Sequence, residues 1–392
     1  MTTKEVYQEP TGDHMAGHRE YKPLPSAYEI FMDEQNLPVY RDIGAYDLRQ
    51  LPLAPWERMG GRGTFLELDG QLWGMYLVEV PAGGVLNAER HIYEETFIII
   101  EGRGSTEIWR EGSSKKQAFE WQPGSHFAIP VNLHHRLVNA ASSPALVLVT
   151  TTAPMTMNLF QSRSFIFDNA NQFPDRYDES EDYFKPREEL EPHPDQGRAM
   201  LDSNLIPDII HCYLPLDNNR APGFRWISPR MGGNAYFQGF LASYPSGRYS
   251  KAHYHAASMI LYCVAGKGYT YNWPVELGPR PWESGKGHLV KRQDYIGGGI
   301  VAAAPGADNW FHQHFSVGKE PLRIRALGTT GNLYSRKRGA GNAGNPSVGV
   351  EIGEGGRAIG YPEEDPMIRK VYQEDLKKEG VELDMPESIY KR

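Results

Sequence analysis

The stretch KAHYHAASMILYCVAGKG at residues 251–268 joins a His-x-His pair to an apolar run that ends in Gly-x-Gly. A similar stretch, AERHIYEETFIIIEGRG at residues 88–104, lies in the first half of the chain. Runs of Ile, Val, Tyr and Phe between glycine turns are typical of β-strands. The two stretches therefore predict the same strand and turn unit in each half of the chain.

An alignment of the two halves extends this similarity. It begins at Pro81 and Pro245 and runs without a gap through the glycine turns that follow. Its informative pairs are Glu89 with His253, His91 with His255, Glu95 with Met259, Gly102 with Gly266 and Gly104 with Gly268. After an insertion in the second copy, His135 aligns with His312. This register predicts that one structural unit occurs twice.

Each copy resembles a cupin. The resemblance rests on the glycine turn, the His-x-His strand, the Gly-x-Gly end of the next strand, a Pro-Gly turn and a final histidine. The last two features lie in WQPGSHFAIPVNLHHRLVN (residues 121–139) and AAAPGADNWFHQHFS (residues 302–316). Two copies make the chain similar to a bicupin over roughly half of its length, which implies an all-β fold of two antiparallel jelly-roll barrels.

The resemblance also implies how the chain divides into domains. The expected parts are a helical or irregular N-terminal arm (1–60), cupin barrel 1 (61–155), a linker (156–235), cupin barrel 2 with the metal site (236–335) and a C-terminal tail with a helix (336–392). The helix is expected in DPMIRKVYQEDLKKEG, where Met367, Val371 and Leu376 could share one face. That face would pack on a barrel or contact another copy of the chain. We expect a homo-oligomer.

Histidines of the second copy predict a metal site. Side chains alternate along a strand, so His253 and His255 project from one face, and His312 and His314 share a face in the same way. Two such pairs inside one barrel would place three or four imidazoles around one point, which suits divalent Fe, Mn, Co, Ni, Cu or Zn. The register makes His312 the third ligand. His314 is either the alternative third ligand or a catalytic group that orients a ligand or bonds the substrate.

The second copy departs from the usual cupin pattern at Met259, where a glutamate ligand is common. An all-histidine site is similar to the iron sites of ring-cleaving dioxygenases of the gentisate type. This resemblance implies Fe(II) as the cofactor, with Mn, Co, Ni and Zn as alternatives. Trp310 is expected at the rim of the cavity, and Arg323 or Arg325 on the next strand could pair with a substrate carboxylate.

The first copy leaves two interpretations open. Its aligned residues Glu89, His91, Glu95 and His135 could hold a second metal ion. Glu89, however, replaces a position that is histidine in most metal-binding cupins. In the alternative interpretation the barrel is only structural, and Arg136 or Arg90 neutralises the buried carboxylates.

Three functions are compatible with these residues. The first is a non-haem Fe(II) dioxygenase that uses O₂ to cleave a small chelating aromatic or dicarbonyl acid. The second is a lyase, isomerase or decarboxylase that uses Mn, Co, Ni or Zn without O₂. The third is a non-catalytic bicupin that binds a ligand or serves in storage. Because inert bicupins generally lose the histidines, the enzyme interpretations come first.

Composition limits the partners of this chain of 392 residues. Lys and Arg number 41 against 49 Asp and Glu, which gives a formal net charge of −8 and disfavours binding to nucleic acid or an anionic membrane. The start MTTKEVYQEPTGDH has neither the basic nor the apolar segment of a signal peptide. Cys212 and Cys263 are too few for a disulfide framework. We therefore expect a cytoplasmic location and a small-molecule substrate.

Overall fold

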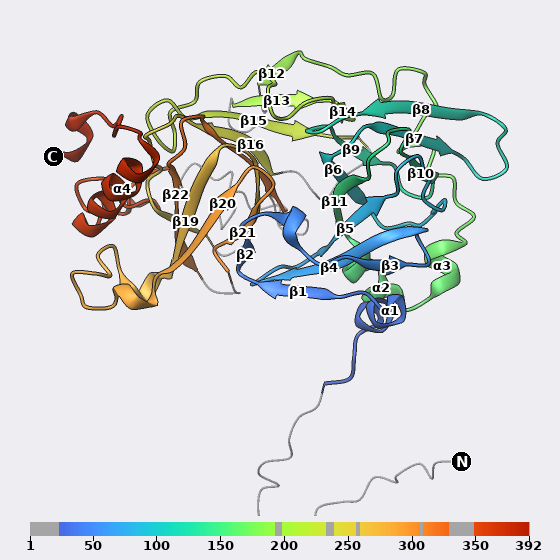
Figure 1. Ribbon diagram of the computed structural model, residues 1–392, viewed down its shortest axis with the longest axis horizontal. Helices are drawn as coiled ribbons and strands as arrows, with labels where there is room; N and C mark the ends of the chain where they lie inside the picture. Colours follow the sequence, from blue (N-terminus) through green and yellow to red (C-terminus); the bar gives the residue numbers. More distant parts are fainter. Residues whose placement is uncertain are drawn as a thin grey trace, which may run out of the picture.

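The computed structural model describes residues 23–192, 198–232, 239–255, 259–305, 309–328 and 349–391. Figure 1 shows these residues as two β-rich lobes beside each other, the first coloured blue to teal and the second mainly yellow to orange. Each lobe combines one large and one small sheet. The predicted all-β class and the bicupin-like arrangement are therefore confirmed.

The first lobe holds a large sheet with the strand order β1-β4-β5-β11-β6-β9-β14, to which β3 adds by pairing with β4. Its strands are β1 (Val39–Asp42), β3 (Ala54–Trp56), β4 (Gly61–Leu68), β5 (Gly74–Val80), β6 (Glu95–Glu101), β9 (His126–Ile129), β11 (Ala145–Thr151) and β14 (Leu205–Ile206). The small sheet has the order β10-β7-β8. Its strands are β7 (Gly104–Trp109), β8 (Lys116–Trp121) and β10 (His134–Val138).

The second lobe repeats this plan with a large sheet of order β12-β13-β15-β16-β23-β18-β21-β2 and a small sheet of order β17-β22-β19-β20. The large sheet contains β2 (Gly44–Ala45), β12 (Leu190–Pro192), β13 (Ala199–Asp202), β15 (Arg225–Arg230), β16 (Phe240–Tyr244), β18 (Met259–Ala265), β21 (Ile300–Ala303) and β23 (Leu322–Leu327). The small sheet contains β17 (His253–His255), β19 (Lys267–Pro274), β20 (Lys291–Ile296) and β22 (Trp310–Ser316).

Two short strands cross between the lobes. The N-terminal arm supplies β2, which pairs with β21 of the second lobe, and the segment after the first lobe supplies β14, which pairs with β9. At Gly44 an added Cβ would lie 2.4 Å from the carbonyl oxygen of Ile300, so this crossing requires glycine. The arm and linker of the expected domain division thus also build sheets, and the exact domain boundaries stay a prediction.

The large sheets of the two lobes pack against each other. Along β6, Phe97 and Ile99 face the interior of the first lobe, whereas Ile98 and Ile100 face a core shared with the second lobe. That shared core also contains Ile260 and other residues of the second large sheet. Burial on both faces explains why these strands are continuous apolar runs rather than alternating ones.

Helices cover the outer parts of both lobes. They are α1 (Ala27–Gln35), α2 (Ala153–Phe160), α3 (Arg163–Phe167) and α4 (Pro366–Glu379), with 3₁₀ turns η1 (Leu48–Gln50), η2 (Val275–Leu277), η3 (Gly287–Leu289), η5 (Ile352–Glu354) and η6 (Glu387–Tyr390). The predicted C-terminal helix is α4, whose Asp365 side chain accepts a hydrogen bond from the Met367 amide. Its buried face is Ile368, Tyr372 and Leu376, one residue away from the predicted Met367 and Val371. This face packs on the small sheet of the second lobe.

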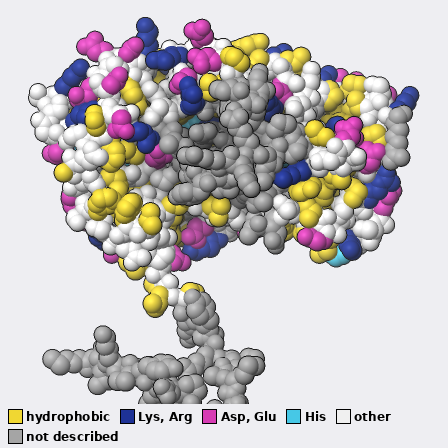
Figure 2. Space-filling view, turned by 180° about the vertical axis from the view of Figure 1, so that it is seen from behind, with side chains coloured by type: hydrophobic (Ala, Val, Ile, Leu, Met, Phe, Trp, Pro, Cys, Tyr) yellow, Lys and Arg dark blue, Asp and Glu magenta, His cyan; other side chains and the backbone are white. Residues whose placement is uncertain are grey.

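The described surface agrees with the charge pattern of the sequence. Figure 2 shows Lys and Arg side chains interspersed with Asp and Glu over the face it presents. Within the described ranges, no helix has the length and apolar character needed to cross a membrane.

A buried polar contact joins the lobes. Nε of Arg325 in β23 donates to Nε2 of His126 in β9 over 3.1 Å, and Nδ1 of His126 lies 2.9 Å from the carbonyl oxygen of Phe97. The carbonyl can only accept, so Nδ1 carries the proton, and because Nε2 accepts from Arg325, His126 is neutral. Burial and the nearby Arg325 charge lower the pKa of His126 to about 3. Burial lowers the pKa of Arg325 to about 9, which leaves it charged at neutral pH.

This contact predicts sensitivity to acid. In the unfolded chain His126 takes up a proton below its ordinary pKa, whereas the folded protein resists that proton until about pH 3. The free energy of unfolding should thus fall by up to about 1.4 kcal/mol per pH unit from this residue as the pH drops through that range. His126→Gln keeps a donor and an acceptor but cannot titrate, so denaturant titrations from pH 7 to 4 should show a shallower acid slope. His288→Gln, at an exposed histidine, should keep the wild-type slope, and equal slopes for all three proteins would contradict the account.

Candidate functional site

Three histidines converge in the second lobe. In the antiparallel pair of β17 and β22, His253 lies directly opposite His312, so both side chains project from the same face. The ring centroid of His312 is 4.1 Å from that of His253 and 4.6 Å from that of His255. One ring nitrogen of each residue lies within 4.8 Å of the others. The structure therefore brings together the three histidines that the register placed at ligand positions.

All three imidazoles are buried, and burial keeps His253 and His312 uncharged. Burial lowers the pKa of both His253 and His312 well below the ordinary value, and the Arg220 charge acts in the same direction. A neutral imidazole keeps a lone pair on one nitrogen, which is the form that binds a metal ion. Three such donors fit a divalent transition metal. We refer to His253, His255 and His312 as the second-lobe cluster.

His314 lies beside this cluster and has a different set of contacts. Its ring centroid is 5.3 Å from that of His312, and its Nδ1 is 3.0 Å from Oγ1 of Thr270. The Thr270 hydroxyl is in turn 2.9 Å from the hydroxyl of Tyr295. This chain of hydrogen bonds holds the His314 ring in one orientation next to the cluster. Its role as a ligand or as an orienting group stays a prediction.

Met259 and Arg220 determine the charge around the second-lobe cluster. Met259 packs in the apolar core of the lobe with Leu261 and Cys263, so it adds no ligand where Glu95 stands in the first lobe. Arg220 is only 6% exposed, and its charge lowers the pKa of His253, His312 and His314, so it lies close enough to act on all three. Sequence reasoning missed Arg220 because it lies outside the repeated unit. The cluster thus combines neutral ligands with a nearby positive charge.

Trp310 and Arg323, the other two residues predicted near the metal site, lie in different environments. Trp310 is half-buried at the start of β22, and Nζ of Lys291 lies 5.5 Å from its ring centre. Arg323 points away from the histidines: its Nε donates to the carbonyl of Ile209 over 3.2 Å and its Nη2 to that of Cys212 over 2.9 Å. The expectation that Arg323 binds substrate is corrected. Its neighbours Leu322 and Ile324 face the core of the lobe, so alternation turns both Arg323 and Arg325 to the opposite face.

Four side chains converge in the first lobe. Glu89, His91, Glu95 and His135 are all buried, and each offers a ligand atom within 4.8 Å of the others. Two backbone hydrogen bonds of 2.9 Å between Glu89 and His135 hold their segments side by side. We refer to these four residues as the first-lobe cluster.

The hydrogen bonds of its histidines favour a metal ion. Nδ1 of His91 lies 3.0 Å from the carbonyl oxygen of Tyr93, and Nδ1 of His135 lies 3.2 Å from that of Leu133. Carbonyl oxygens only accept, so both Nδ1 atoms carry the proton and both Nε2 atoms present lone pairs. These Nε2 atoms lie 3.3 and 3.8 Å from Oε2 of Glu95. When Glu95 is ionised, these three acceptors face one another without a donor, and a divalent cation removes this conflict.

The electrostatics of the first-lobe cluster agree with this interpretation. Burial lowers the pKa of His91 to about 4, so it is neutral at physiological pH. Burial also raises the pKa of Glu95 to about 7, although the nearby His135 acts against the rise. Within the described ranges, neither Nε2 of His91 nor Oε2 of Glu95 has a hydrogen-bond partner. These orphaned buried atoms fit a metal site better than a purely structural barrel.

The counter-ion of this cluster is Arg58. Its Nη2 pairs with Oε1 of Glu89. The sequence analysis proposed Arg136 or Arg90 instead, but Arg136 binds Glu107 at 2.8 Å and Arg90 lies 3.7 Å from Glu111. Those two expectations are corrected. Arg58 was missed because it lies in the N-terminal arm, outside the repeated unit.

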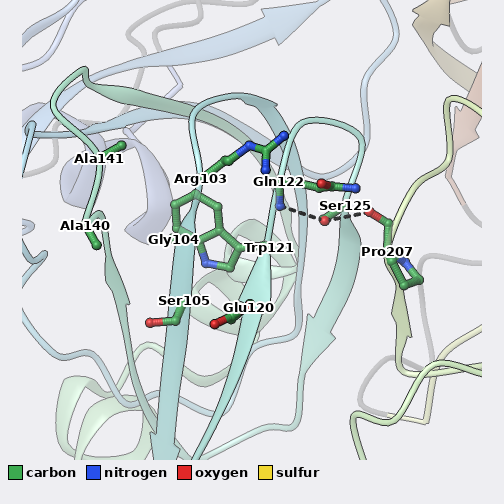
Figure 3. A pocket seen from close by; sticks show the side chains of 10 residues that line it. All are labelled: Arg103, Gly104, Ser105, Glu120, Trp121, Gln122, Ser125, Ala140, Ala141 and Pro207. Atoms are coloured by element: carbon green, nitrogen blue, oxygen red, sulfur yellow. Dashed lines mark hydrogen bonds between the residues drawn. The ribbon is translucent and has the colours of Figure 1, made fainter.

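One surface hollow of the described residues lies apart from both clusters. Figure 3 shows this hollow of about 530 Å³ at β7 and β8, with the Trp121 ring next to Gly104 and Arg103 above it. At Gly104 an added Cβ would lie 2.6 Å from the Trp121 ring, so glycine leaves room for the indole. The Ser125 hydroxyl there accepts from the Gln122 amide and donates to the carbonyl of Pro207. These bonds fix a loop, and no residue of either cluster lines this hollow.

No curated protein matches the chain. Among solved structures, a single-substitution variant of Bacillus subtilis oxalate decarboxylase is similar at a TM-score of 0.44 and 11% identity, over 73% of this chain and 77% of that chain. A variant of the same enzyme with a two-residue deletion gives 0.45 and 12%, over 81% of this chain and 86% of that chain.

The family comparison concerns the first lobe. Residues 76–151 match the family model described as the cupin domain. This range runs from β5 to β11 and contains all four residues of the first-lobe cluster. Residues 76–151 are therefore similar to a cupin domain.

Proposed function

We propose that this protein is a metal-dependent enzyme whose second-lobe cluster binds a small organic acid that chelates the metal. The observation that carries the proposal is the convergence of three buried imidazoles, two of them held neutral by burial, close to the Arg220 charge. Neutral ligands would leave a divalent ion its full charge, and Arg220 adds one more positive charge. An anion with two oxygen donors is the ligand that this arrangement favours.

Each residue near the cluster has a distinct part in the proposal. His253, His255 and His312 would hold the metal, and Arg220 would pair with a substrate carboxylate. His314, fixed by Thr270, would orient the bound acid by a hydrogen bond from its ring. A bound divalent ion would supply polarisation of the oxygen atoms of the acid.

One reaction class is oxidative cleavage by O₂ with Fe(II). It is supported by the all-histidine set, because Met259 adds no fourth protein ligand and coordination positions stay open for substrate and O₂. In the first lobe, His91, Glu95 and His135 form a two-histidine, one-carboxylate set, a combination common at non-haem iron.

The second reaction class is a non-oxidative one: a lyase, isomerase or decarboxylase reaction. It is supported by Glu89, which gives the first-lobe cluster a second carboxylate. The cluster thereby offers more of the oxygen ligands that hard metal ions prefer. Carboxylate ligands suit Mn(II), and Mn(II) also accepts imidazole, so one metal would serve both clusters. The requirement for O₂ separates this class from the first.

The metal ligands are tested by removing two of them. Protein purified without chelator should contain a divalent metal, and His253→Ala with His255→Ala should lose the ion of the second lobe. The fold should remain, since the apolar cores do not depend on these side chains. Elemental analysis and a thermal melt measure both properties, with His288→Ala at an exposed histidine as the control. Unchanged metal content in the double variant would refute the assignment.

Arg220 is tested through substrate binding. Arg220→Gln should raise KM for the acid by about tenfold to a hundredfold, because a charge-assisted bond worth about 1.5–3 kcal/mol is lost. Arg323→Gln is the matched control: its guanidinium binds backbone carbonyls away from the histidines, so KM should stay the same. Equal KM values for wild type and Arg220→Gln would remove Arg220 from the site.

Dioxygen decides between the two reaction classes. With hydroxylated aromatic acids, dicarbonyl acids and dicarboxylic acids as the panel, oxidative cleavage predicts stoichiometric O₂ uptake and no turnover under anaerobic conditions. Full turnover without O₂ would assign the non-oxidative class. If the metal-loaded protein binds an acid but turns none over in either atmosphere, the enzyme proposal is wrong and a binding protein remains.

A further inference from the structure

We propose that Arg58 is a positioning residue of the first-lobe cluster, which holds the Glu89 carboxylate where it can bind a metal ion. In this role the N-terminal arm completes a site whose other members lie in the repeated unit. The inference rests on the proposed metal binding of that cluster. It concerns metal affinity and geometry, not the reaction at the second lobe.

The contacts of Arg58 restrict its guanidinium to one position. Arg58 follows β3, and its guanidinium carbon lies 5.4 Å from the ring centre of Phe31 in α1 and 5.5 Å from that of Phe167 in α3. From this position Nη2 reaches Oε1 of Glu89. Its Nη1 also donates to Sδ of Met59 over 3.8 Å. Two aromatic rings, a carboxylate and a sulfur atom leave the side chain little freedom, as positioning requires.

The charges explain why the site needs this cation. Glu89 aligns with His253 of the second lobe, so the first lobe carries a carboxylate where the second has a neutral ligand. The Glu89 side chain is 6% exposed, and it shares the buried cluster with Glu95. Two carboxylates at such a distance repel each other in a poorly solvated space. Arg58 binds one Glu89 oxygen, which reduces the repulsion and leaves the other oxygen for a metal ion.

Arg58 also lies between the cluster and solvent. With Glu34, Trp56 and Glu57 it lines a surface hollow of about 750 Å³. Its side chain is 29% exposed, against 6% for that of Glu89. The same residue therefore orients a ligand on its inner side and separates the cluster from this hollow on its outer side.

The direction in which metal affinity changes separates positioning by Arg58 from a simple charge effect. Arg58→Met removes a cation near a divalent ion, so electrostatics alone predicts tighter metal binding. Loss of positioning predicts binding that is weaker by about 10–100-fold. We expect the weaker binding, and an intermediate loss for Arg58→Lys, which keeps the charge but not the two-pronged geometry.

The measurement uses the full chain with His253→Ala and His255→Ala, so that the measured Co(II) binding comes from the first-lobe cluster alone. Co(II) affinity is determined by competition with a chelator, and the Co(II) absorption spectrum reports the ligand geometry. Arg62→Met is the matched control, because Arg62 lies close by in sequence and pairs with Glu79 at 3.3 Å outside the cluster. It should leave both affinity and spectrum unchanged.

A double-mutant cycle shows whether Arg58 acts through Glu89. In a Glu89→Gln background, Arg58→Met should cause no further weakening and no further change in the spectrum. Unchanged or tighter Co(II) binding by folded Arg58→Met or Arg58→Lys would overturn the proposal, as would equal weakening with and without Glu89. If the chain with an intact first-lobe cluster binds no Co(II), the proposed metal site itself fails, and the role of Arg58 fails with it.

Discussion

The site depends on one constraint, which is that buried imidazole nitrogens, joined in the first lobe by carboxylates, converge on one small space in each lobe. In the first lobe the main chain determines this arrangement, because the carbonyls of Tyr93 and Leu133 hold the Nδ1 protons of His91 and His135. Both Nε2 atoms must then point at Glu95. In the second lobe the pairing of β17 with β22 places His253 opposite His312, and Nδ1 of His312 has no hydrogen-bond partner among the described residues. A bound cation would satisfy buried nitrogen atoms in both lobes.

The two clusters share a plan but differ in charge. The first contains two carboxylates and is paired with Arg58, whereas the second contains only imidazoles and lies near the Arg220 charge. With a divalent ion in each, the first cluster with Arg58 would be weakly positive and the second with Arg220 strongly positive. We therefore expect an anionic substrate to prefer the second lobe. This difference supports a division in which the second cluster binds the acid and the first holds its ion in a closed protein shell.

The repeat predicted the members of both clusters because side chains alternate with a strict period along a strand. The same rule gave no direction for Arg323 and Arg325, since both faces of β23 are covered and the apolar pattern does not mark which is inside. Arg58 and Arg220 lie outside the repeated unit, so no register assigned them. The crossing strands β2 and β14 are two residues long, too short for a periodic signal. Long-range packing determines where these arginines and these short strands lie, and the sequence pattern does not contain that information.

The central claim, that both clusters bind metal ions through the named side chains, is tested most directly by anomalous X-ray diffraction from crystals grown with Mn(II). The account predicts one anomalous peak among Glu89, His91, Glu95 and His135, and another among His253, His255 and His312. Nitrogen and oxygen atoms should surround each peak at about 2.0–2.3 Å. Ordered histidines with no anomalous density at either cluster would contradict it.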